Sequence, residues 1–237
     1  MDTFAPRPGR RRLLLAAAAA LPVGCAGPQF VPPPAGAIPA PRVQVGQRWR
    51  YDEINRYNGE RRAVVTAEVV QVSPQLRVSL TDADGRRRDD EIYDRPWRVV
   101  QEPSYDYTQI FDRPVPLLPE PLAVGGGGFT QVGYRSVLGR DYPLVWNERM
   151  VARGWEDLRV PAGQFLALRV ERIIQFVHID FRREESVREE TIWYAPAVNR
   201  WVQREWTGRY VIPGGDFKPI YREDWVRWQL LDWREAG

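Results

Sequence analysis

The chain contains one cysteine, one histidine and one lysine in 237 residues, and these scarcities exclude several kinds of site. A single cysteine cannot form a disulfide within the chain. One histidine and one cysteine do not supply the ligand sets that hold zinc in most proteins. The acidic stretches at residues 82–90 and 184–190 are interrupted by arginine and lack the spacing of a calcium-binding loop. The sequence therefore predicts no metal and no other cofactor.

The sequence also lacks a surplus of charge outside its first residues. Its formal net charge is +3. Residues 1–24 hold four arginines and one aspartate, so residues 25–237 carry 30 basic and 30 acidic side chains. A protein that binds nucleic acid needs a basic surplus on one face, and we expect no such partner here. Nearly all the basic residues are arginine, which a GC-rich genome explains more simply than a specialised arginine surface.

The apolar run near the N-terminus is too short to anchor the chain as a membrane-spanning helix. Residues 13–23 form a run of 11 residues, whereas a bilayer-spanning helix needs roughly 20. Three arginines precede the run, and a small residue and the only cysteine follow it. This order is typical of an export signal. We therefore predict that residues 1–24 are a signal peptide.

The details of that signal point to a lipoprotein. Residues 10–14, Arg-Arg-Arg-Leu-Leu, resemble a twin-arginine signal, with general secretory export as the alternative route. Residues 23–25, Val-Gly-Cys, resemble the end of a bacterial lipobox, in which the cysteine is lipid-modified and becomes the new N-terminus. Pro22 stands where that pattern prefers leucine, so cleavage nearby that leaves a free thiol stays open. We expect lipid attachment at Cys25, because a lone cysteine in an exported chain has no internal disulfide partner.

Proline, glycine and apolar alternation divide the rest of the chain. The proline-rich residues 25–43 are predicted to form an extended tether, since proline cannot donate to a sheet or a helix interior. Residues 44–237 are predicted to form a single antiparallel β domain of eight to eleven strands, with few or no long helices. Within it, five prolines and four consecutive glycines at residues 103–128 predict a long irregular excursion.

Two blocks in the second half of the chain carry its most specific pattern. They are residues 160–171, Val-Pro-Ala-Gly-Gln-Phe-Leu-Ala-Leu-Arg-Val-Glu, and residues 190–202, Glu-Thr-Ile-Trp-Tyr-Ala-Pro-Ala-Val-Asn-Arg-Trp-Val. Each block has a proline-containing turn between strand-like runs, which predicts a hairpin.

These blocks resemble the TapB-like domain, a family of uncharacterised bacterial envelope proteins that are similar in shape to the open-barrel lipoprotein carriers of the LolA/LolB type. The resemblance covers residues 145–233, and it extends to the first half of the chain only through residues 46–51. It implies an all-β fold in which a twisted antiparallel sheet forms an open half-barrel.

The candidates for catalytic chemistry are weak. His178 shares a predicted strand face with Asp180, a pairing that could orient an imidazole as a general base. A triad also needs a nucleophile, and the sequence has no Gly-x-Ser-x-Gly elbow. The glycines at residues 125–128 do not match a phosphate-binding loop. We therefore expect no catalytic residue and no enzyme, with a hydrolase that uses His178 as the less favoured alternative.

The functional hypothesis follows from the apolar strand faces and the implied half-barrel. We expect a non-catalytic lipoprotein on the periplasmic face of the cell envelope, which binds or carries an apolar ligand or a lipidated partner. Ala26 replaces the aspartate associated with inner-membrane retention, which favours the outer membrane. The leucines of residues 115–122 either cover the barrel mouth or dip into a lipid surface, or else they pack against the sheet. The alternative is an assembly lipoprotein that docks another envelope protein, and the sequence does not identify the ligand-binding residues.

Overall fold

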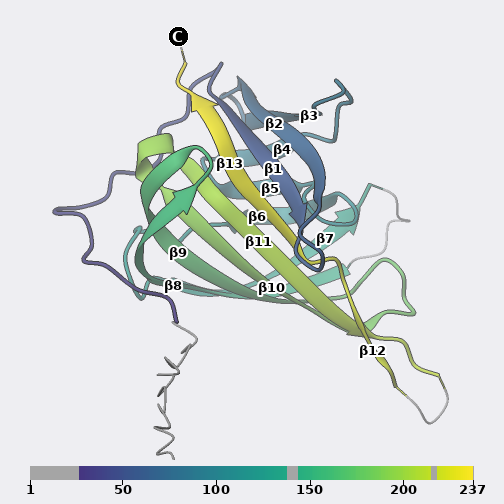
Figure 1. The fold of residues 1–237 in the computed structure, drawn as a ribbon. Coiled ribbons are helices and arrows are strands. Elements are labelled where there is room, and N and C mark those ends of the chain that lie inside the picture. Colours follow the sequence, from purple (N-terminus) through teal and green to yellow (C-terminus); the bar gives the residue numbers. More distant parts are fainter. Residues whose placement is uncertain (1–26, 138–143, 215–217, 237) are drawn as a thin grey trace, which may run out of the picture.

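The computed structural model describes residues 27–137, 144–214 and 218–236. Cys25 and the predicted signal peptide lie outside these residues. All the strands in the described ranges belong to one antiparallel sheet (Figure 1). No helix in these ranges has the length and hydropathy needed to cross a bilayer. The elements are β1 Arg48–Asn55, β2 Arg61–Gln71, β3 Leu76–Asp82, β4 Glu91–Arg95, β5 Arg98–Glu102, β6 Gln109–Pro116, β7 Gly127–Ser136, β8 Leu144–Val160, β9 Gly163–Phe176, β10 Glu184–Ala195, the 3₁₀ turn η1 Pro196–Val198, β11 Arg200–Val211, β12 Ile220–Arg222 and β13 Val226–Arg234.

The sheet closes on itself into a barrel. Strands β1 to β11 form a meander in which each strand pairs with the next, and β13 pairs with both β1 and β11. Of the thirteen strands, only β12 lies outside the ring, where it pairs with β11. The prediction of an open half-barrel is therefore wrong, although the chain is all-β and antiparallel. Closure removes the two free edges that a half-barrel would expose.

The closing strand β13 shows why the sequence does not reveal the closure. Its inward side chains Val226, Trp228 and Leu230 are buried, whereas the alternating Arg227 and Gln229 are only partly buried. This alternation fixes which face of a strand is buried, but it does not fix which two strands lie beside it. The pairing of the last strand with the first therefore had no local signal.

The two hairpins expected from the sequence blocks are confirmed. Val160 pairs with Gly163 across a two-residue turn between β8 and β9. Gly163 has a φ of 137°, a conformation that favours glycine. Ala195 pairs with Arg200 across η1, and Asn199 takes the left-handed conformation that ends the turn.

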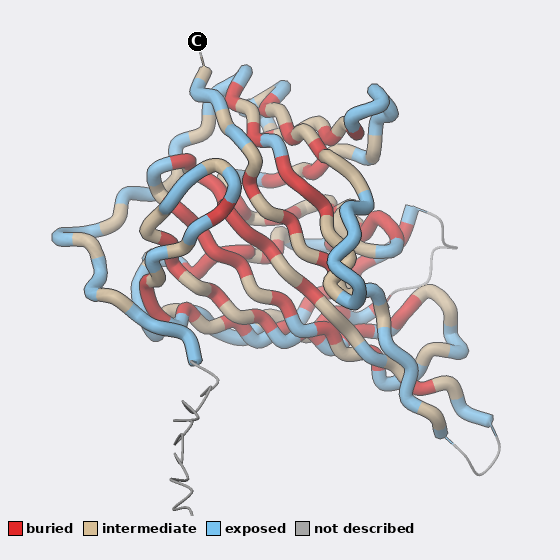
Figure 2. Tube along the Cα trace, in the orientation of Figure 1, coloured by how far each residue is buried: buried red, intermediate tan, exposed pale blue. Residues whose placement is uncertain are grey.

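A closed barrel of twelve strands must fill a wide interior. Eight strands already enclose about as much space as their own side chains fill. A wider ring therefore needs larger side chains to fill its interior. Buried positions alternate with more exposed ones along the strands (Figure 2). Six tryptophans are almost fully buried: Trp49, Trp97, Trp146, Trp155, Trp201 and Trp228.

The predicted excursion at residues 103–128 includes an ordered strand, β6, and enters the core at several places. Tyr105 and Tyr107 pack with the core at one end of the barrel, and Leu117 and Leu118 are buried at the other. These leucines therefore pack against the sheet, which is the second of the two alternatives considered for them.

The described part of the proline-rich segment, residues 27–43, lies along the outside of the barrel (Figure 1). The backbone N–H of Val31 donates to the carbonyl of Trp155 at 2.7 Å. A Cβ on Gly154 would lie 2.4 Å from the ring of Phe30, so this glycine makes room for that ring. Ile38 also packs against the core. The segment thus contacts the wall instead of standing away from it.

We expect the Leu230→Ala variant to lose about 2–5 kcal/mol of unfolding free energy, since it deletes a fully buried side chain that β13 contributes to the core. The control is Ile173→Ala on β9, whose side chain is 49% exposed, and it should lose less than about 1 kcal/mol. Urea denaturation measures both. Equal losses would show that β13 does not close the barrel.

Candidate functional site

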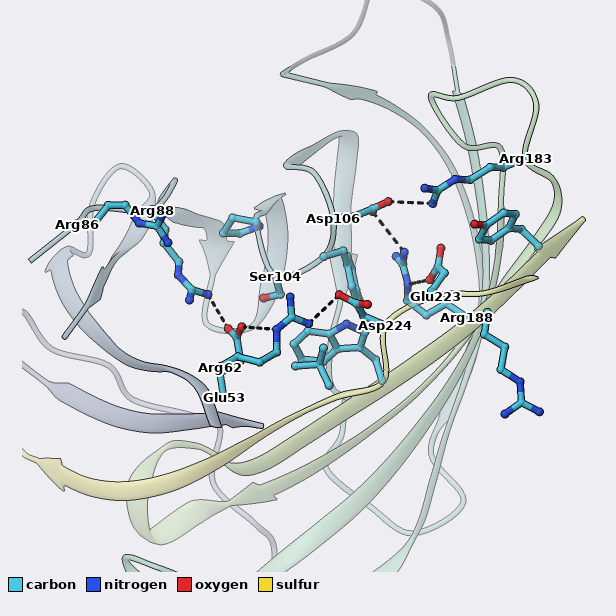
Figure 3. A pocket seen from close by; sticks show the side chains of 16 residues that line it. Glu53, Arg62, Arg86, Arg88, Ser104, Asp106, Arg183, Arg188, Glu223 and Asp224 are labelled. Atoms are coloured by element: carbon cyan, nitrogen blue, oxygen red, sulfur yellow. Dashed lines mark hydrogen bonds and ion pairs between the residues drawn. The ribbon is translucent and has the colours of Figure 1, made fainter. Parts of the chain in front are cut away.

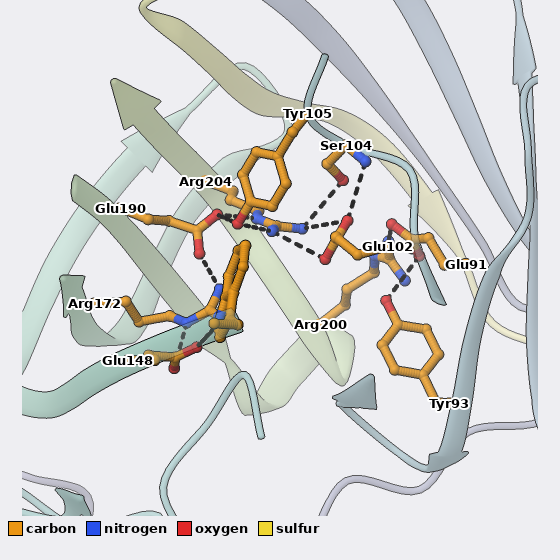
Figure 4. A network of polar contacts seen from close by, with 11 residues as sticks. Glu91, Tyr93, Glu102, Ser104, Tyr105, Glu148, Arg172, Glu190, Arg200 and Arg204 are labelled. Carbon is orange, nitrogen blue, oxygen red and sulfur yellow. Dashed lines mark hydrogen bonds and ion pairs between the residues drawn. The ribbon is translucent and has the colours of Figure 1, made fainter. Parts of the chain in front are cut away.

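A chain of ion pairs crosses the interior of the barrel (Figure 4). Glu148 on β8, Arg172 on β9, Glu190 on β10 and Arg204 on β11 follow one another on neighbouring strands, and Arg204 then reaches Glu102 on β5. β5 lies across the ring from β11. The chain of ion pairs therefore links opposite walls of the barrel.

The geometry of these contacts is that of fully desolvated salt bridges. Arg172 donates from Nε and Nη2 to the two oxygens of Glu148 at 2.8 and 2.7 Å, and it also donates to Glu190. Arg204 donates from Nε to Glu190 at 2.6 Å and from Nη2 to Glu102 at 3.1 Å. None of these side chains is more than 3% exposed. Removing one partner would leave a buried charge without compensation.

A second buried ion pair involves Arg200, the first residue of β11. Arg200 donates to both oxygens of Glu91 at 2.9 and 2.6 Å, and the hydroxyl of Tyr93 donates to the same carboxylate at 2.9 Å. The guanidinium of Arg200 also lies 3.8 Å from the ring centre of Trp201 and 4.9 Å from that of Trp97. Such cation–π contacts stabilise a buried cation.

Electrostatics keeps these groups charged. Burial alone would raise the pKa of Glu190, but the neighbouring Arg204 and Arg172 outweigh burial and lower the pKa below its ordinary value. Burial alone would also lower the pKa of both arginines, and their glutamate partners raise it instead. The interior of the barrel is therefore filled by ionised side chains and aromatic rings. The carrier hypothesis needs an unfilled apolar concavity, and these side chains occupy the middle of the barrel.

A polar pocket of about 530 Å³ opens at the end of the barrel where β1 and β11 end and β10 and β13 begin (Figure 3). We call it the arginine pocket. Its charged lining residues are Arg62, Arg86, Arg88, Arg183, Arg188, Arg222, Glu53, Asp106, Glu223 and Asp224. They come from distant parts of the sequence, and the closed barrel brings them together.

The carboxylates of the arginine pocket are all paired with arginines, and arginines outnumber them. The closest pairs are Arg88–Glu53 at 2.7 Å, Arg62–Asp224 at 2.7 Å, Arg188–Glu223 at 2.8 Å and Arg183–Asp106 at 3.3 Å. Arg222 is exposed and forms no ion pair with any residue that the structure describes. The pocket thus carries a net positive charge.

His178 lies beside this pocket in a fully bonded setting. Its Nδ1 accepts the backbone N–H of Asp180 at 2.9 Å, so its Nε2 carries the proton and donates to Asp106 at 2.9 Å. Burial alone would raise the pKa of Asp106, but the bond from His178 and the charges of Arg188 and Arg183 lower it. The predicted partner Asp180 thus contributes its backbone, and the carboxylate comes from Asp106, which the sequence did not indicate.

An apolar groove lies at the opposite end of the barrel, between the proline-rich segment and residues 118–122. One part, of about 330 Å³, is lined mainly by Ile38, Pro41, Trp97, Leu118, Pro121 and Leu122. A neighbouring part, of about 350 Å³, shares Ile38, Pro121 and Leu122 and extends to Trp155. Both volumes fall within the range of about 300–1,000 Å³ that is usual for small-molecule sites.

The sequence reasoning missed both the ion-pair network and the arginine pocket. Genome composition alone does not explain the abundance of arginine, because four arginines are at most 2% exposed: Arg172, Arg188, Arg200 and Arg204. A local signal did exist, because these arginines occupy strand positions that alternate in step with buried apolar residues. In the described ranges, no group of three or more His, Cys, Asp or Glu side chains could hold a metal ion.

Comparisons with known proteins give a fold and no family. No family model matches the chain, and no curated protein matches it. The TapB-like and LolA/LolB resemblance therefore stays a prediction.

Several solved structures are similar to the chain. One is a Bacteroides fragilis protein described as exported and as having a YmcC-like fold, with 13% identity and a TM-score of 0.51, covering 84% of this chain and 100% of that one. A Parabacteroides distasonis protein described as a lipoprotein has 13% identity and a TM-score of 0.49, covering 81% and 96%. The hypothetical lipoprotein YmcC of Escherichia coli has 11% identity and a TM-score of 0.44, covering 81% and 85%. At 13% identity, the likeness to the Bacteroides fragilis protein shows a shared fold.

We expect Glu190→Gln to lose about 3–5 kcal/mol of stability at neutral pH. The two buried arginines Arg172 and Arg204 would lose the charged carboxylate that they share. The matched control is Glu189→Gln on the outer face of β10, whose side chain is 61% exposed; it should change stability by less than about 0.5 kcal/mol.

The same variant tests the direction of the pH dependence. Because folding lowers the pKa of Glu190, its carboxylate stabilises the fold above the unfolded value of about 4.3 and ceases to do so as the pH falls through the folded value. Urea denaturation between about pH 7 and pH 3 should show a flatter pH dependence for Glu190→Gln than for the wild type. Parallel curves would contradict a charged, paired Glu190.

Proposed function

We propose that this chain is a non-catalytic lipoprotein of the bacterial cell envelope, anchored through Cys25, which binds an apolar ligand or a lipidated partner in the apolar groove. The observation that carries the proposal is the groove itself. Its lining is mainly apolar, it is open to a ligand, and it lies outside the filled interior of the barrel.

The position of the groove relative to the predicted anchor supports the proposal. Phe30 and Val31 are held against β8, and Cys25 precedes Phe30 by five residues. Five residues span at most about 18 Å when fully extended. A lipid on Cys25 would thus hold the barrel near the membrane, with the groove beside the anchored segment. The outer membrane, favoured by Ala26, is part of this proposal.

An envelope location is supported by the predicted export signal at residues 1–24 and by the description of the Bacteroides fragilis protein of similar fold as exported. The absence of catalysis is supported by the setting of His178. Both of its ring nitrogens are engaged: Nδ1 accepts from the backbone of Asp180 and Nε2 donates to Asp106, with the guanidinium of Arg183 3.3 Å from Nε2. None of these partners is a nucleophile.

A second candidate function is the docking of another envelope protein, which β12 favours. This strand lies at the edge of the sheet with Ile220 69% exposed. Ile220 also lines, with Val177 and Val211, a pocket of about 550 Å³. An exposed strand edge with apolar side chains is a ready site for pairing with another chain.

Native mass spectrometry of the full chain, extracted from membranes in mild detergent, tests the groove. We expect bound lipid on the wild type and at least tenfold lower occupancy on Leu122→Glu and Ile38→Glu, since each variant places a carboxylate among apolar groups. The control is Val72→Glu, an exposed position outside the groove, which should keep the wild-type occupancy.

The same spectra report the mass of the N-terminus, and an acylated Cys25 is expected. A wild type without retained lipid, or groove variants that retain as much as the control, would contradict the binding proposal. Recovery of a stable protein complex in place of lipid would favour the docking function. An unmodified Cys25 would contradict the anchor.

A further inference from the structure

Arg188 in the arginine pocket has an unused hydrogen-bond donor. Its side chain is 2% exposed, and its Nε donates to Glu223 at 2.8 Å. Its Nη1 has no hydrogen-bond partner in the described ranges, although it is buried. A buried donor of this kind costs free energy unless a ligand or water satisfies it.

Aromatic rings hold this donor in place. The guanidinium of Arg188 lies over two rings, 4.0 Å from the ring centre of Tyr105 and 4.6 Å from that of Phe176. The planar fork is therefore oriented before any ligand arrives, so little conformational entropy is lost on binding. At the same opening, Arg183 is positioned over the ring of Tyr210 at 4.5 Å.

The charge of the pocket selects the class of ligand. Six arginines and four carboxylates line the pocket, and each of those carboxylates already has an arginine partner. Arg86 and Arg88 also pair with Asp82 behind the lining, at 2.8 and 2.6 Å. With Asp82 counted, the excess is one positive charge, so the pocket favours an anion, and a phosphomonoester carries a charge of about −1.5 to −2 at neutral pH. Arginine forks also match the geometry of phosphate oxygens.

We propose that the arginine pocket binds a phosphomonoester group, carried either by a lipid headgroup or by a soluble phosphate ester. Arg188 offers its unpaired Nη1 to a phosphate oxygen, and Arg183 contributes charge beside it (Figure 3). Arg222, which also lines the pocket, adds a further charge. The pocket lies at the opposite end of the barrel from the apolar groove. This inference therefore goes beyond the proposed function and does not depend on it.

Isothermal titration calorimetry and vesicle flotation test the inference, with the full-length Cys25→Ser chain so that no lipid anchor contributes. The probes are inorganic phosphate, glycerol 3-phosphate, and phosphatidylcholine vesicles with and without phosphatidic acid. We expect Arg222→Gln and Arg183→Gln each to weaken binding about tenfold, the size of one lost charge-assisted hydrogen bond. Arg188→Lys should weaken it as well, because it keeps the charge and loses the fork.

The matched control is Arg209→Gln, an exposed arginine on β11 that pairs with Glu189 outside the pocket. It should bind like the wild type. Binding of the soluble phosphates alone would support a soluble ester, and binding of phosphatidic acid vesicles alone would support a headgroup. Binding of neither, or equal affinity in Arg222→Gln, Arg183→Gln and the control, would overturn the inference and leave a pocket filled only by water.

Discussion

The rest of this structure depends on how a closed ring of twelve strands fills its interior. Apolar side chains of ordinary size do not fill a barrel of this width, and this chain uses tryptophan together with arginine–glutamate pairs. The pair Arg204–Glu102 joins β11 to β5 on the far wall, and Arg200–Glu91 joins β11 to β4. These buried charges stabilise one another only while both walls are in place, so closure and pairing support each other.

A filled barrel leaves its pockets at the two ends. A ligand that entered the middle would have to separate ionised groups from their buried partners, which costs several kcal/mol per group. The two pockets with a defined chemistry lie at opposite ends, one apolar beside the segment that leads to Cys25 and one rich in arginine. The structure is thus a filled barrel whose two ends differ in chemistry.

The sequence predicts the parts of this fold that are local. Turn chemistry at residues 160–163 and 195–200 identifies two hairpins, because proline and glycine restrict the backbone there. The sequence does not predict that β13 joins β1, because alternation carries no information about neighbouring strands. The arginine pocket was equally hidden, since its residues meet only after closure. The open half-barrel came from the family resemblance, and the β1–β13 pairing contradicts it.

Acrylamide quenching of tryptophan fluorescence tests the filled interior most directly. Of the ten tryptophans, six are almost fully buried, while Trp225 and Trp233 are partly exposed. The structure predicts that acrylamide quenches only a minor part of the native emission, and that unfolding in guanidinium exposes the remainder. Native emission that is fully quenched, with a constant close to that of the unfolded chain, would show an open concavity and contradict the account.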